Sequence, residues 1–80
     1  MDFLEINKKA YEVIKEALHK EPDSISSIEK TEEGWRVEAE ILEKKAVPET
    51  FDLLKIFEFI LDNNGKVQSF KLLKRKHRGD

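Results

Sequence analysis

The chain begins with a hydrophobic pattern that is typical of an amphipathic helix. Between residues 2 and 20, apolar side chains recur every three or four positions and therefore line one helical face. Asp2 and Glu5 have the spacing of a capping box, in which each side chain bonds the other residue's backbone N–H. Pro22 disfavours helical geometry at Glu21. We therefore predict a helix over about residues 2–20.

The rest of the chain has the two-residue period of β-strands. In the clearest segment, Trp35, Val37, Ala39 and Ile41 alternate with mainly charged neighbours. Pro48 has no backbone N–H to donate and interrupts strand pairing after this segment. We predict strands at about residues 26–31, 35–45, 53–61 and 67–76.

The pair Asn64-Gly65 predicts a tight hairpin between the last two strands, because these residues favour a type I′ turn. A two-residue loop there gives the cross-strand pairs Phe59–Phe70, Phe57–Leu72, Glu58–Lys71 and Ile56–Leu73. The apolar face on which we expect the helix to pack consists of Phe57, Phe59, Leu61, Phe70 and Leu72. The predicted fold is α+β. An N-terminal helix packs on one face of a curved antiparallel three- to four-stranded β-meander, in a single domain of residues 1–80.

The opposite face of this sheet also carries apolar side chains, which one helix is too small to cover. They are Leu54, Ile56, Ile60 and Leu73. Two interpretations remain open. Either the sheet curls over these side chains, or they form a contact patch for a partner, including a second copy of the chain.

Charge is segregated along the sequence. The net charge is −2, but residues 71–80 hold five basic residues and one acidic residue, so the other seventy carry −6. A candidate electrostatic contact site consists of Lys74, Arg75, Lys76 and Arg78. Such a cluster can dock on an acidic protein surface or bind phosphates. It can also be a solvated strand end that discourages aggregation.

No motif in the chain points to catalysis. Cysteine is absent, which excludes disulfides and thiolate sites, and the three glycines are too scattered for a phosphate-binding loop. His19 and His77 are far apart in the sequence and lack the further ligands of a zinc site. We expect no enzyme activity, no cofactor and no metal site. Neither a signal peptide nor a membrane-spanning apolar run is recognisable, so we expect a cytoplasmic protein.

From Pro22 onward the chain resembles the gas vesicle protein O family. The resemblance runs through Gly34-Trp35-Arg36-Val37, then Val47-Pro48-Glu49-Thr50, Phe57-Glu58-Phe59 and the basic ending from Phe70 to Gly79. It implies a cytoplasmic accessory protein in gas vesicle formation that associates with the vesicles. It also implies binding to the major shell protein and to other accessory proteins.

Two alternative functions are weaker. A nucleic-acid-binding regulator of vesicle-gene expression would use the basic C-terminal residues, but exposed stacking aromatics are not evident beside them. An inhibitory module similar to PepSY or cystatin domains would share the order of one helix followed by a meander. The lack of a recognisable signal peptide disfavours that second alternative.

Overall fold

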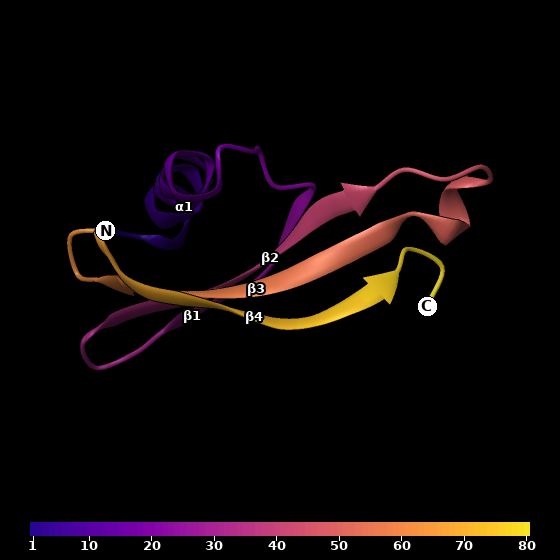
Figure 1. The fold of residues 1–80 in the computed structure, drawn as a ribbon. Helices are drawn as coiled ribbons and strands as arrows, with labels where there is room; N and C mark the ends of the chain where they lie inside the picture. Colours follow the sequence, from indigo (N-terminus) through magenta and orange to yellow (C-terminus); the bar gives the residue numbers. More distant parts are fainter.

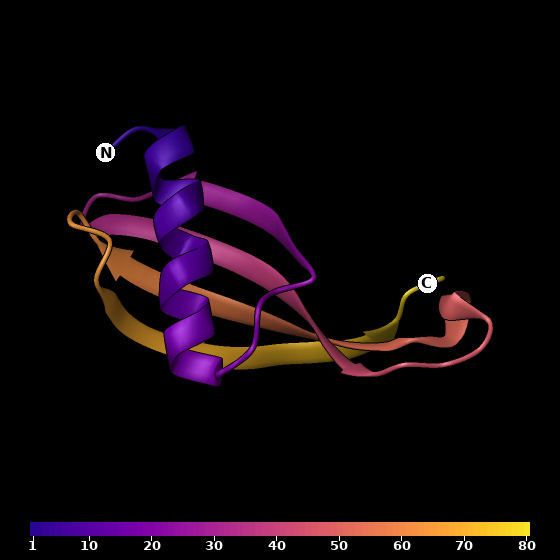
Figure 2. The same ribbon diagram turned by 90° about the horizontal axis from the view of Figure 1, so that it is seen from above.

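The computed structural model describes residues 1–80 and has the predicted α+β architecture. One helix lies over one face of a four-stranded antiparallel sheet with the strand order β1-β2-β3-β4 (Figure 1). Seen from above, the helix crosses the strands at a steep angle near one end of the sheet (Figure 2). The elements are α1 (Phe3–Leu18), β1 (Ser24–Lys30), β2 (Gly34–Lys44), the short 3-10 helix η1 (Glu49–Phe51), β3 (Leu53–Asp62) and β4 (Val67–His77).

The predicted capping box at the start of α1 is confirmed. The backbone N–H of Glu5 donates to the Asp2 carboxylate at 2.8 Å, and the N–H of Asp2 donates to the Glu5 carboxylate at 3.2 Å. The helix ends earlier than predicted because His19 adopts left-handed geometry with φ 56°, which stops the helical hydrogen-bond pattern after Leu18.

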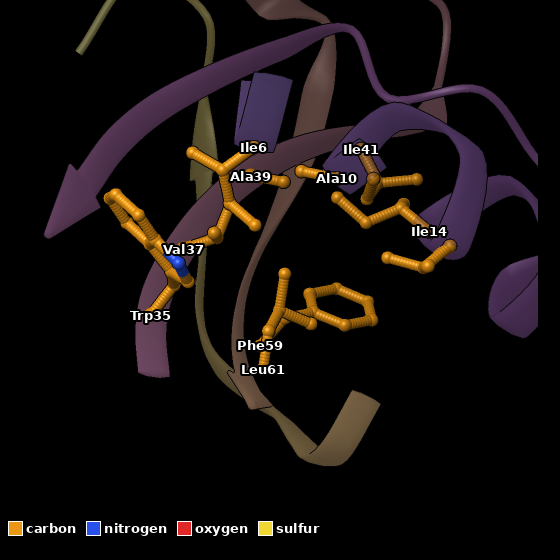
Figure 3. Packing of buried hydrophobic residues seen from close by; sticks show 10 residues of the cluster. Ile6, Ala10, Ile14, Trp35, Val37, Ala39, Ile41, Phe59 and Leu61 are labelled. Carbon is orange, nitrogen blue, oxygen red and sulfur yellow. The ribbon is translucent and has the colours of Figure 1, made fainter. Parts of the chain in front are cut away.

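The hydrophobic core lies between α1 and the two central strands (Figure 3). The helix contributes one face, and β2 contributes the alternating side chains that the sequence pattern predicted. Both Ala10 of α1 and Ala39 of β2 are fully buried, and such small side chains allow close approach of a helix to a sheet. The buried cluster consists of Ile6, Ala10, Val13, Ile14, Trp35, Val37, Ala39, Ile41, Phe59 and Leu61.

The predicted position of the helix over the sheet is only partly right. Phe59 and Leu61 of β3 are buried beneath it, but Phe70 and Leu72 of β4 remain exposed. The core includes four side chains of β2 and none of β4. The helix is therefore centred on the inner strands, and β4 is an edge strand with an uncovered face.

The predicted β3–β4 register is right at the centre of the hairpin and wrong at its ends. The pairs Phe57–Leu72, Glu58–Lys71 and Phe59–Phe70 are confirmed. Two bulges then shift the pairing, so that Ile56 lies opposite Lys74 rather than Leu73. Bulges of this kind increase the local twist of a strand and curve the sheet.

The hairpin turn is longer than the two-residue loop that the sequence predicted. The N–H of Asp62 donates to the carbonyl of Lys66 at 2.8 Å, and the N–H of Gly65 donates to the carbonyl of Asp62 at 3.0 Å. Gly65 has φ 81°, whereas Asn64 has no positive φ, so the turn is not type I′. A type I turn followed by a left-handed glycine fits these bonds, and it leads directly into the first β4 bulge.

A third bulge explains why the start of β1 was predicted too late. The predicted strand began at residue 26, because Ile25 and Ile28 are out of phase for a regular strand. The register shifts between Ile25 and Ser27, and both isoleucines pack against the core on the same face. The strand consequently starts two residues earlier, at Ser24.

Candidate partner-binding surface

The sheet face away from α1 carries a network of ion pairs. The Arg36 guanidinium contacts the carboxylates of Glu58 at 2.5 Å and Glu38 at 2.9 Å, and Lys71 approaches Glu58 at 3.7 Å. The hydrogen bond from Glu58, followed by its charge, raises the pKa of Arg36 above its ordinary value. The four side chains therefore neutralise one another within the chain.

The predicted apolar patch on this face is mostly covered by the chain itself. Leu54 and Ile56 are buried although they lie outside the main core cluster, and Ile60 is half-buried. Leu73 is 39% exposed and lies at the second β4 bulge. Leu54 and Ile56 are thus covered within the chain itself, and Leu73 is the most exposed of the four side chains.

The four predicted basic residues differ in what they contact. Lys74 is exposed and forms no ion pair. Arg75 pairs with Glu43 at 2.8 Å, and Lys76 approaches Glu40 at 3.7 Å. These three residues belong to β4, which ends at His77, within one residue of the predicted end.

Arg78 clamps three distant parts of the chain together. Its guanidinium donates to the Asp23 carboxylate at 2.9 and 3.3 Å, and its Nε donates to Asp52 at 3.1 Å. Asp52 is buried and also accepts a hydrogen bond from the N–H of Ala46 at 2.7 Å. That backbone bond, with the bond and charge of Arg78, lowers the pKa of Asp52, while the two carboxylates raise the pKa of Arg78.

Sequence reasoning missed this clamp because its members are separated by 26 and 55 residues. No spacing rule links such positions. Arg78 was predicted as a contact residue, and the structure shows it paired with Asp23 and Asp52.

A second exposed surface lies on the helix side of β4, which sequence reasoning assigned to the core. Phe70 is 45% exposed, yet its ring stacks on buried Phe59 with a centroid distance of 5.1 Å. Leu72 is exposed two residues further along the same strand. Because β4 is an edge strand, its outer backbone groups are also unpaired.

The structure shows no cluster of three or more metal-ligating side chains. His19 ends α1, and His77 lies 4.0 Å from Asp80 at the other end of the chain. No helix has the length and apolarity needed to cross a bilayer.

The matches of the chain to known proteins all indicate the same family. The family model described as "Gas vesicle synthesis protein GvpO" matches residues 1–80. Gas vesicle protein O1 of Halobacterium salinarum is 36% identical over 72 residues, which cover 90% of this chain and 60% of that protein. Gas vesicle protein O of Haloferax mediterranei is 41% identical over 73 residues, which cover 90% of this chain and 52% of that protein.

A third relative is gas vesicle protein O of a Streptomyces species, 41% identical over 59 residues, or 74% of this chain and 46% of that protein. The chain thus spans between about half and three fifths of the length of these relatives. No solved structure matches it. The whole-length family match and the three relatives agree with the resemblance found in the sequence, and the chain belongs to the gas vesicle synthesis protein GvpO family.

Proposed function

We propose that this chain is a non-enzymatic accessory protein in gas vesicle formation, located in the cytoplasm. In this role it binds the major shell protein and other accessory proteins during assembly. The observation that carries the proposal is the family match over all eighty residues. The names of the relatives, each a gas vesicle protein, support the same role.

The surface that we assign to this binding is the face of β4 that is turned away from α1, around Leu73 and Lys74. Lys74 is the basic residue of this strand that no carboxylate neutralises, and it follows exposed Leu73 directly. The buried side chains Leu54 and Ile56, with half-buried Ile60, support the strand from the neighbouring β3. Arg75, Lys76 and Arg78 add positive potential there, although each is engaged by a carboxylate.

Binding measurements with purified gas vesicle proteins of the same organism test the proposal. The immobilised chain is exposed to the shell protein and to each accessory protein in turn. Charge reversal by Lys74→Glu should weaken binding several-fold at low salt, because it replaces attraction by repulsion at an exposed site. Lys8→Glu is the matched control, since Lys8 is an exposed lysine of α1 without an ion pair.

The two outcomes that contradict the proposal are distinct. If the unmodified chain binds none of the vesicle proteins, the proposed function is wrong. If it binds and the two charge reversals have equal effects, the assigned surface is wrong.

No specific observation favours the nucleic-acid alternative. The basic residues that motivated it are paired with carboxylates, with the exception of Lys74. A titration with RNA and DNA at two salt concentrations separates the alternatives. Phosphate contacts give a steep linear fall of log affinity with log salt.

A further inference from the structure

The ends of β2, β3 and β4 extend beyond the helix as a distal arm, which we define as residues 42–55 and 74–80. Both views show this arm projecting away from α1 and ending in the loop that contains η1 (Figures 1 and 2). The molecule is elongated as a result, with extents of 40 × 21 × 21 Å. The loop and η1, residues 45–52, form the distal tip.

The distal tip presents two apolar side chains to solvent. Val47 is 99% exposed and Phe51 is 61% exposed. Single exposed apolar residues are common on protein surfaces. These two, however, lie in one short loop at the end of the molecule remote from the core, where they contribute little to folding.

The tip is held in a defined conformation, so the exposure is not that of a loose loop. Within it, the N–H of Phe51 donates to the carbonyl of Pro48 at 3.1 Å, and the Asp52 carboxylate binds the N–H of Ala46. From outside, the N–H of Gly79 donates to the carbonyl of Thr50 at 2.9 Å. A loop ordered in this way loses little conformational entropy when a partner binds, and that favours affinity.

The Arg78 clamp strengthens the same arrangement. The backbone N–H of Arg78 donates to the carbonyl of Asp52 at 2.8 Å, and its side chain binds the Asp52 and Asp23 carboxylates. The C-terminal residues therefore link Asp52 of the tip to Asp23, the residue before β1.

The charge of the arm indicates the chemistry of the partner. The arm holds seven basic and four acidic residues, a net charge of +3, and the remaining body carries −5. Two of the seven, Lys76 and Arg78, are paired with Glu40 and Asp23 of the body. Lys44 and Lys45 lie at the base of the tip and are both exposed. Two arms repel each other, which disfavours a symmetric tip-to-tip dimer, while an acidic surface on another protein attracts the arm.

We propose that the distal tip docks into an apolar pocket, bordered by carboxylates, on a different protein, with Val47 and Phe51 as the anchoring side chains. The inference rests on the proposed binding role of the chain. The anchoring residues lie in the tip, whereas Lys74 lies in β4 at the start of the arm.

The test compares the full chain with a Val47→Ser, Phe51→Ser variant in binding to each purified gas vesicle protein of the same organism. Anchor residues in a buried pocket typically carry enough of the binding energy that their loss weakens affinity by at least about tenfold. Leu4→Ser is the matched control, because Leu4 is 70% exposed at the other end of the molecule. Circular dichroism and urea unfolding should be unchanged in both variants.

A second variant tests the electrostatic part. Lys44→Glu with Lys45→Glu should weaken binding several-fold at about 50 mM salt and less at about 500 mM, because salt screens exposed charges. Equal or tighter binding by this variant would overturn the acidic character of the partner.

The remaining outcomes separate this inference from the proposed function. If the full chain binds and the Val47→Ser, Phe51→Ser variant binds equally well, the assignment of the tip is overturned and the proposed function stands. No binding to any vesicle protein overturns the proposed function and the inference with it. Self-association in sedimentation equilibrium that the same variant abolishes would identify a second copy of the chain as the occupant, and would overturn the assignment to a different protein.

Discussion

Phe59 and Phe70 face each other across β3 and β4, but the structure places them in different environments. Phe59 is fully buried beneath α1, whereas Phe70 is nearly half exposed on the edge strand. Truncating each to alanine therefore tests where the helix lies on the sheet. Sequence reasoning put both rings in the core and would expect similar losses of stability.

The structure predicts unequal losses. Phe59→Ala removes a fully buried ring and leaves a cavity, which costs about 3–5 kcal/mol. Phe70→Ala loses about half of the 1.5–3 kcal/mol that full burial of a Phe side chain contributes, and it also loses about 0.5–1.5 kcal/mol of ring stacking. The two contributions together predict that Phe70→Ala costs about 1.3–3 kcal/mol.

Urea unfolding followed by tryptophan fluorescence measures both losses. The chain has one tryptophan, the buried Trp35, whose ring meets Phe3 edge-on at 5.1 Å. A chain of this size has a total stability of about 4–12 kcal/mol, so Phe59→Leu serves as a milder variant if Phe59→Ala does not fold. Equal losses for Phe59→Ala and Phe70→Ala would refute the placement of α1 over the inner strands.

Three further predictions concern local features. Asp2→Ala should lower the free energy of unfolding by about 1 kcal/mol, measured by thermal unfolding, because it removes the helix cap; an unchanged melting temperature would contradict the capping box. Gly34→Ala should be more destabilising in urea than Gly65→Ala, because a Cβ at Gly34 would overlap the backbone carbonyl of Leu61, whereas at Gly65 it meets the flexible side chain of Lys9 and the main cost is the left-handed backbone, about 1–2 kcal/mol; the reverse order would contradict this packing. Asp52→Asn should destabilise the chain at neutral pH, and the difference from the unmodified chain should vanish as the pH falls below the ordinary aspartate value of 3.8 and through the lower folded-state pKa; a pH-independent difference in urea unfolding would contradict the role of the ionised carboxylate.

The helix and the strands could be predicted from the sequence because their signals are local. The capping box of Asp2 and Glu5 set the start of α1, and the alternation from Trp35 to Ile41 set the buried face of β2. These patterns depend on residues within a few positions of each other. They are therefore visible without knowledge of the tertiary structure.

The bulges could not be predicted in the same way. An extra residue in one strand changes the pairing with its neighbour, and the residues at Ser26 and Leu73 have no special composition. The type I′ turn would place both Asn64 and Gly65 in left-handed geometry, but only Gly65 adopts it. This difference depends on how the turn joins the first bulge of β4. The sequence pattern therefore predicted the β3–β4 register correctly at the centre of the hairpin and incorrectly at its two ends.

The candidate surface was less accessible to sequence reasoning than the fold. The pattern identified apolar side chains on both sheet faces, but it did not show that Leu54 and Ile56 are buried in the folded chain. The basic ending was recognised as a cluster, yet the contacts of Arg78 with Asp23 and Asp52 join residues far apart in the chain. Such long-range pairs are fixed by the tertiary structure alone.

Gene deletion with complementation tests the central claim most directly. Electron microscopy counts the gas vesicles in cells that lack this gene and in cells that regain it. We predict that deletion abolishes or strongly reduces the vesicles, and that the unmodified chain restores them. Undiminished vesicle formation in the deleted strain would contradict a role for this chain in gas vesicle formation.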